Sequence, residues 1–151
     1  ISYIKQEAII KNADSFDKYK VLLSQTGAEH AGEPSKDGKF NVLSSTMKVL
    51  EPMDVCTHSY LTVGFFNCFS EATSLIKYLK TMFVRFLVLQ TISSIHITKN
   101  NFIFVPLQDF TENSDIDWSK SIHEIDLQLY KKYNLDDTEI EFIEKNVKEM
   151  S

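Results

Sequence analysis

Residues 70–89, SEATSLIKYLKTMFVRFLVL, decide the fold. Their apolar side chains recur at i, i+3, i+4 and i+7, which is the spacing of one buried stripe on a helix. Ser70 is a residue type that caps helix N-termini, and no Gly or Pro interrupts the run. The stretch therefore predicts one long helix from about Ser70 to about Val88. The stripe consists of Ala72, Leu75, Ile76, Leu79, Met82, Phe83, Phe86 and Leu87.

Strand-like segments lie on both sides of this helix. They are short and rich in β-branched and aromatic residues, and polar or turn-forming stretches separate them. Pro52 cannot donate a ladder hydrogen bond and should end its strand. In THSYLTVGFF (57–66), the alternation predicts a core strand in which Leu61, Val63 and Phe65 share one face. The other predicted strands are YKVLL (19–23), FNVLSS (40–45), MKVLEPM (47–53) and NFIFVPLQ (101–108).

The last third of the chain predicts two helices, SIHEIDLQLYKKYN (121–134) and LDDTEIEFIEKNVKEM (135–150). Asp136 or Asp137 can cap the second helix, and Leu135 can act as its hydrophobic staple. Together these elements predict an α+β fold. It consists of a mainly antiparallel sheet packed on one long helix, with a C-terminal helical pair.

Length and composition predict a single domain. The chain has 151 residues, of which 43% are hydrophobic, and this suffices for one core. We expect residues 1–16 to form an N-terminal linker or helix and residues 17–151 to form the domain. Because the first residue is Ile1, we expect a piece of a longer protein. No apolar run has membrane-spanning length and no leader is recognisable, and the two cysteines form no disulfide framework, so we expect a cytoplasmic protein.

Motifs for catalysis are sparse. The glycines do not form a nucleotide-binding turn, and the four histidines and two cysteines lack metal-ligand spacing. Cys56 and His58 would stand side by side on a strand, which does not favour a nucleophile and its base. One enzymatic alternative stays open, a small metal-dependent nuclease that uses Asp14, Asp17 and Glu29.

Two polar loops have the chemistry of nucleic-acid recognition. Residues 24–39, SQTGAEHAGEPSKDGK, follow an apolar strand, and residues 91–101, TISSIHITKNN, follow the long helix. Both contain hydroxyl, imidazole and lysine side chains, which are types that contact base edges and phosphates. From Lys77 to Asn101 every charged residue is basic, whereas acids predominate from Glu112 onward. Ordinary solvated connections can have the same composition, so that alternative stays open at this point.

Four stretches together resemble the C-terminal target-recognition region of bacterial adenine-specific DNA methyltransferases of restriction–modification systems. In that family a lysine-containing strand runs into the motif S-x-x-x-G-A. A strand with the motif T-x-S/T-Y-L then precedes a helix with the motif E-A-x-x-x-x-x-Y-x-K-T-x-F-x-R-F-L. Two further motifs follow, F-V-P-x-Q-D-F and L-Y-K-K-Y-x-L-x-x-x-E-I-x-F-I-E. The matching stretches are DKYKVLLSQTGAEHAGEP (17–34), CTHSYLTVGFFNCFSEATSLIKYLKTMFVRFLV (56–88), NNFIFVPLQDF (100–110) and LYKKYNLDDTEIEFIE (129–144).

The resemblance implies a module that reads double-stranded DNA and is not catalytic by itself. The family's catalytic D/N-P-P-Y/F motif and its cofactor-binding glycines are not in this sequence. The resemblance therefore implies that a methyltransferase domain of the same polypeptide binds S-adenosylmethionine and methylates the adenine. Whether the parent enzyme also cleaves DNA stays open at this point. The net charge of −5 is unusual for an autonomous DNA-binding protein, so we expect the catalytic domain to share the phosphate contacts.

If the resemblance holds, the two polar loops should lie on the same side of the domain, near Thr57 and Ser59. The candidates for base and hydroxyl-mediated contacts are Ser24, Gln25, Thr26, His30, Thr57, Ser59, Ser93, Ser94 and His96. The candidates for phosphate contacts are Lys36, Lys39, Lys80, Arg85 and Lys99. A further alternative is an interaction scaffold in which the acidic C-terminal helices dock a partner.

Overall fold

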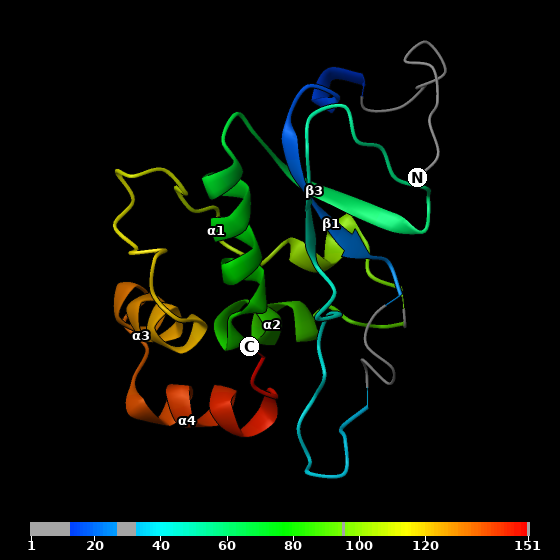
Figure 1. Ribbon diagram of the computed structural model, residues 1–151. Coiled ribbons are helices and arrows are strands. Elements are labelled where there is room, and N and C mark those ends of the chain that lie inside the picture. The colour runs from blue at the N-terminus through cyan, green and yellow to red at the C-terminus, as the bar shows by residue number, and fades with distance from the viewer. Residues whose placement is uncertain (1–12, 27–32, 95, 151) are drawn as a thin grey trace.

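A three-stranded antiparallel sheet with strand order β2-β1-β3 forms one layer of this α+β fold (Figure 1). The computed structural model describes residues 13–26, 33–94 and 96–150. The predicted helix within residues 1–12 lies outside these ranges. The strands are β1 (Tyr19–Ser24), β2 (Lys48–Leu50) and β3 (Tyr60–Phe66). The helices are α1 (Phe69–Lys80), α2 (Met82–Leu89), α3 (Ile122–Lys132) and α4 (Asp137–Asn146), with short 3-10 helices η2 (Ala13–Ser15) and η3 (Lys99–Phe102).

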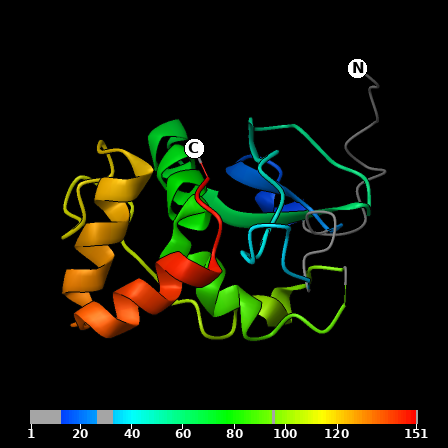
Figure 2. The same cartoon turned by 90° about the horizontal axis from the view of Figure 1, so that it is seen from below.

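The core lies between the sheet and α1. On the central strand β1, Val21 and Leu23 are fully buried, and they pair with Val63 and Leu61 of β3. Helix α1 packs across this face and contacts all three strands (Figures 1 and 2). The predicted apolar stripe is thus confirmed as the side of the helical segment that faces the core. Its buried members are Ala72, Leu75, Leu79, Met82 and Phe83.

Strand β3 contains a bulge at Gly64 that changes which residues face the core. Lys20 pairs with Phe65 and Val21 pairs with Val63, so Gly64 is an extra residue in the ladder. Its φ of +65° is a backbone conformation that glycine adopts readily. The predicted core position of Phe65 is therefore wrong: this ring is 50% exposed, and Phe66 packs inward. β3 lies at the edge of the sheet, and its Leu61 and Val63 pack against the core as predicted.

The predicted long helix is interrupted at Thr81. This residue has φ −61° and ψ 149°, which is extended rather than helical backbone, and it separates α1 from α2. Its hydroxyl donates to Tyr78 O (2.6 Å) and accepts from Val84 N (3.3 Å). The carboxylate of Asp126 on α3 accepts from the next two free amides, Met82 N and Phe83 N, at 2.9 Å each. These contacts satisfy the amides of a new helix start and stabilise the break.

Two predicted strands have other structures. Residues 40–45 form no strand, because the backbone of Phe40 bonds the C-terminal tail instead, accepting from Lys148 N and donating to Asn146 O. Residues 101–108 form part of η3 and a turn, since the side chain of Asn101 accepts from Thr98 N (2.8 Å) and starts a 3-10 helix. The start of α1 also differs from prediction. Its N-cap is Cys68 rather than Ser70, and no side chain caps it.

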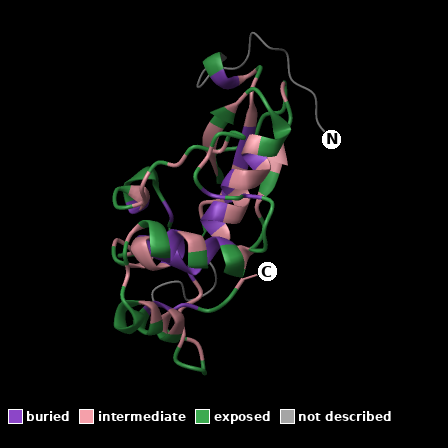
Figure 3. Cartoon of the chain, turned by 90° about the vertical axis from the view of Figure 1, so that its left-hand side faces the viewer, coloured by how far each residue is buried: buried purple, intermediate pink, exposed green. Residues whose placement is uncertain are grey.

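The two C-terminal helices are confirmed. Ser121 caps α3 and Asp136 caps α4, and each has a reciprocal capping box with the glutamate three residues later. The inner sides of both helices join the core through Ile125, Leu129 and Ile143. Figure 3 shows buried residues along the central helix and on the inner sides of its neighbours, with exposed residues on the outer surfaces. No helix in the described ranges is both long and apolar enough to cross a membrane.

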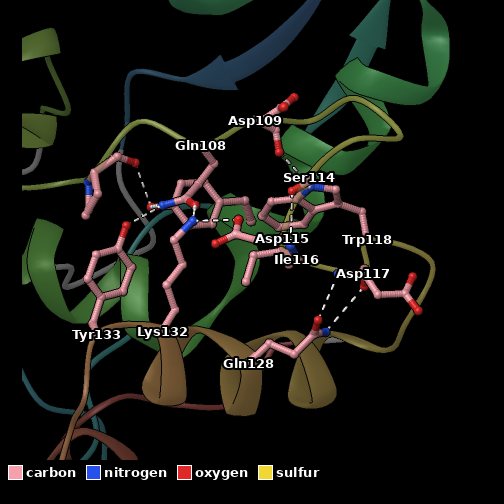
Figure 4. Close-up of polar contacts among 12 residues, drawn as sticks. Gln108, Asp109, Ser114, Asp115, Ile116, Asp117, Trp118, Gln128, Lys132 and Tyr133 are labelled. Atoms are coloured by element: carbon pink, nitrogen blue, oxygen red, sulfur yellow. Dashed lines mark hydrogen bonds and ion pairs between the residues drawn. The ribbon is translucent and has the colours of Figure 1, made fainter.

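A strap, residues 106–120, runs across α1 and α3 with little regular structure of its own. The ammonium group of Lys77 on α1 donates to three of its carbonyls, those of Trp118, Ser119 and Lys120, at 2.8–3.2 Å. From α3, Lys132 binds Asp115 at 2.7 Å and Gln108 at 2.9 Å (Figure 4). Side chains of the two helices therefore fix a segment that has no ladder or helix bonds to hold it.

Candidate nucleic-acid interface

Three segments that are far apart in the sequence meet where β1 ends. Gln25 N donates to Ser59 O (3.2 Å), and Ile97 N donates to Gln25 O (2.7 Å). Thr26 and His96 form an isolated antiparallel bridge. We call Gln25, Thr26, Ser59, Tyr60 and His96 the strand-end cluster; β1 ends toward the right-hand side of Figure 1. The start of the first polar loop, residues 24–26, therefore lies beside Ser59 and the second loop as expected, whereas residues 35–39 at its other end lie beside α4.

The cluster is polar and open to solvent. Thr26, Ser59 and His96 are exposed, and Gln25 is half-buried. The nearby predicted residues Thr57, Ser93, Ser94 and Lys99 are also exposed, and Ser24 is half-buried at the end of the strand. Hydroxyl, amide and imidazole groups on one surface can donate and accept hydrogen bonds to base edges, and Lys99 adds a positive charge.

A buried asparagine holds the base of the 91–101 loop. The side-chain amide of Asn101 donates to Thr91 O (2.9 Å), and its side-chain oxygen accepts from Thr98 N. The backbone carbonyl of Asn101 accepts from the Thr91 hydroxyl (2.9 Å). These bonds join the two ends of the loop. A fixed base limits the backbone conformations from which such a loop presents its side chains, and this lowers the entropy cost of binding a ligand.

Arg85 is not a phosphate contact in this structure, so this prediction is wrong. Its side chain is 0% exposed, and it donates to Lys80 O (3.0 Å) and Lys148 O (2.6 Å). Burial lowers the pKa of Arg85 to about 10, which keeps the guanidinium charged at neutral pH, and Asp126 supplies the largest compensating charge. The same burial raises the pKa of Asp126 to about 6. The arginine therefore ties α2 to the C-terminal tail.

The remaining predicted lysines lie elsewhere. Lys39 donates to Glu144 O (2.8 Å) near the end of α4, a contact that favours a helix C-terminus. Lys36 is exposed on the adjoining turn, in which Gly38 N donates to Ser35 O. Lys80 is the last residue of α1 and is half-buried at the junction with α2. These three residues belong to the helical side of the molecule, and His30 lies outside the described residues.

The acids of the nuclease alternative do not gather at the cluster. Asp14 lies in η2 and Asp17 lies between η2 and β1, at the opposite end of β1 from Gln25. Glu29 lies outside the described residues. Within the ranges that the structure describes, no three His, Cys, Asp or Glu side chains are placed to hold a metal ion together.

Sequence reasoning missed Tyr60, whose carbonyl lies 3.5 Å from the Gln25 side-chain amide. Its ring is exposed on the outer face of β3, and an exposed aromatic beside hydroxyl groups can stack on a base. The alternation in SYLTV places Tyr60 opposite Leu61 and Val63, so the sequence did contain a signal for an outward ring.

Charge divides between the two halves of the chain. Residues 13–101 contain nine bases and eight acids, whereas residues 102–151 contain five bases and twelve acids. The excess negative charge thus belongs to the strap and the C-terminal helices rather than to the segments that build the cluster. Fold and site together define an α+β chain with a polar surface at one sheet end. No protein-family model matches this chain, and no curated protein or solved structure matches it.

Proposed function

We propose that this chain is the sequence-reading module of an adenine-specific DNA methyltransferase from a restriction–modification system. It binds double-stranded DNA through the strand-end cluster and does not itself catalyse methyl transfer. A methyltransferase domain of the same polypeptide binds S-adenosylmethionine, extrudes the adenine and methylates it. The assembly acts in the cytoplasm.

The observation that supports this function best is the convergence of residues 24–26, residues 96–97 and the start of β3 at the end of β1. Three backbone contacts join segments separated by more than thirty residues: Gln25 with Ser59, Gln25 with Ile97, and Thr26 with His96. Base readout requires several donors and acceptors held at fixed positions on one surface, and such convergence supplies them. Residues 13–101, which build the cluster, contain nine bases and eight acids, so this nearly balanced half repels a phosphate backbone less than the acidic half of the chain does.

The test starts from selection of DNA sites. The 151-residue chain is incubated with a pool of random duplexes, bound molecules are sequenced, and affinities for the selected and a scrambled duplex are measured by fluorescence anisotropy. Gln25→Ala and His96→Ala should weaken binding to the selected duplex by about 1–3 kcal/mol, roughly 5- to 150-fold, and leave the scrambled duplex unchanged. Lys99→Ala should weaken both duplexes and reduce the slope of log K against log salt by about 0.9.

Lys131→Ala is the matched control, since Lys131 is an exposed lysine on α3 within the acidic half. It should leave both affinities and the salt slope unchanged. The proposal fails if no sequence is enriched from the pool. It also fails if the cluster variants, shown to be folded by circular dichroism, behave like Lys131→Ala.

A further inference from the structure

An apolar groove lies between α2 and α4, on the helical side of the molecule. It has a volume of about 410 Å³. Its apolar lining consists of Phe83, Phe86 and Leu87 from α2, Leu135 from the turn before α4, and Phe142 and Ile143 from α4. Figures 1 and 2 place α4 on the opposite side of the molecule from the end of β1, and none of these residues belongs to the strand-end cluster.

The groove is preformed and open. Its floor is rigid because Phe83 and Ile143 are buried in the core, and Phe83 stacks on Tyr133 with ring centroids 5.1 Å apart. Its outer wall is Phe142, which is 57% exposed and meets Phe86 edge-to-face at 5.8 Å. A large aromatic ring left exposed above an apolar floor is typical of a protein contact surface.

The polar rim of the groove carries one acid, and the helix that forms this wall is acidic. Glu139 and Thr138 line the groove beside the apolar residues, and residues 136–146, which include α4, contain five acids and one base. This charge determines which ligands fit. An acidic wall repels the phosphates of nucleic acid and of anionic membranes, and two copies of α4 facing each other would also repel. A ligand with basic groups beside an apolar face has the complementary chemistry.

We propose that this groove docks a single amphipathic helix of a partner segment, with apolar residues on one face and lysine or arginine beside them. The groove is formed by a helix of eight residues and one of ten residues, so each wall is about 12–15 Å long at 1.5 Å per residue. That length accommodates two to three turns of a helix, whose i, i+3, i+4 and i+7 side chains fill the floor. This inference does not depend on the DNA-binding proposal.

The probes are two synthetic peptides of about four turns. One contains leucine on one face and lysine elsewhere, and the other has every lysine replaced by glutamate. Each is labelled and titrated with the 151-residue chain by fluorescence anisotropy. The lysine peptide should bind at least about tenfold more tightly than the glutamate peptide, and its affinity should fall between about 0.05 M and about 0.5 M salt because screening weakens the charge contacts.

Three variants locate the binding site. Phe142→Ser removes an exposed wall residue and should weaken the lysine peptide by at least about tenfold. Glu139→Gln removes a rim charge but keeps the capping hydrogen bond that the Glu139 side chain accepts from Asp136 N, so it should weaken binding and reduce its salt dependence without unfolding α4. Leu127→Ser is the matched control, because Leu127 is 49% exposed on α3 away from the groove, and it should change nothing.

Several outcomes would overturn the proposal. The two peptides could bind equally, or neither could bind. Phe142→Ser could have no more effect than Leu127→Ser. Size-exclusion chromatography with light scattering could show a dimer that Phe142→Ser dissociates, and the occupant would then be a second copy of this chain.

Discussion

The contact between Asp126 and the start of α2 gives the sharpest stability prediction. Asp126→Ala should destabilise the protein by about 3–5 kcal/mol, because three effects combine at this position. The Met82 and Phe83 amides lose their acceptor at 2.9 Å, and the buried guanidinium of Arg85 loses its compensating charge. A hydrogen bond to a charged group contributes about 1.5–3 kcal/mol, and an uncompensated buried charge adds a further cost.

The free energy of unfolding would be measured by urea denaturation at pH 7, followed by far-UV circular dichroism. Glu141→Ala is the control, since Glu141 is an exposed acid on α4, and it should change stability by no more than about 0.5 kcal/mol. A double variant, Asp126→Ala with Arg85→Met, removes both buried charges. It should recover part of the loss because no lone charge remains in the core.

The reasoning would be refuted if Asp126→Ala cost less than about 1 kcal/mol with an unchanged m-value, because the side chain would then stabilise no more than an ordinary surface residue. A double variant less stable than Asp126→Ala by the full cost of Arg85→Met alone would also contradict it. The two side chains would then act independently.

Three further predictions concern single positions. Burial raises the pKa of Asp126 from 3.8 to about 6, so the folded protein keeps the carboxyl proton to higher pH than the unfolded chain does. The free energy of unfolding relative to Asp126→Asn should therefore fall as pH rises from about 4 to about 6. Urea denaturation across that pH window measures this change. Gly64→Ala should cost at least about 1–2 kcal/mol in the same assay, because φ is +65° and the added Cβ would lie 2.5 Å from a ring carbon of Phe66 and 2.6 Å from a methyl of Leu75; an unchanged midpoint would contradict the bulge. Leu79→Ala should cost about 2–5 kcal/mol, since this side chain is buried between α1 and the sheet, and a loss below about 1 kcal/mol would show that α1 does not pack there.

The helical stripe was predictable from the sequence, but the break within it was not. The apolar spacing continues from α1 through Thr81 into α2, so periodicity alone indicates one helix. The break depends on Asp126, which lies 44 residues after Met82 and caps it through tertiary contact. The burial of Arg85 also depends on a distant residue. Its guanidinium donates to the carbonyl of Lys148, which is 63 residues away, so the sequence of the helix alone could not predict this burial.

The strand-end cluster was predictable in outline because each loop follows a recognisable apolar element. Strand β1 ends at Ser24 and the apolar helix ends near Leu89, so both loops start from the packed layer. Which side chains of β3 point to the core was harder to predict. Gly64 is visible in the sequence, but whether it is an extra residue in the ladder depends on the pairing with β1. The bulge shifts the register by one residue, and this places Phe65 on the outer face.

Three of the residues that carry the family resemblance meet in the scaffold, whereas Ser59 and Tyr60 of the T-x-S/T-Y-L motif belong to the strand-end cluster. Tyr78 from the helix motif donates to Pro106 O (2.8 Å), and the Gln108 amide of the F-V-P-x-Q-D-F motif donates to Tyr133 of the C-terminal motif (2.7 Å) and lies 3.3 Å from the Tyr78 hydroxyl. Figure 4 shows Gln108 between Tyr133 and Lys132, where the strap meets α3.

This arrangement separates the residues that hold the scaffold together from Gln25 and His96 of the strand-end cluster. Tyr78, Gln108 and Tyr133 come from three motifs distant in sequence, and the Gln108 amide donates to both tyrosine hydroxyls, so a change at Gln108 removes a donor from each of them. Gln25 and His96 lie outside that hydrogen-bond network. The ends of their loops are fixed, but other side chains could replace these two without breaking the network. If the chain is the recognition module proposed above, its scaffold can stay the same while the side chains at the strand end change. The DNA sequence that such a module reads would then follow from loop residues such as Gln25 and His96 rather than from the network of Tyr78, Gln108 and Tyr133.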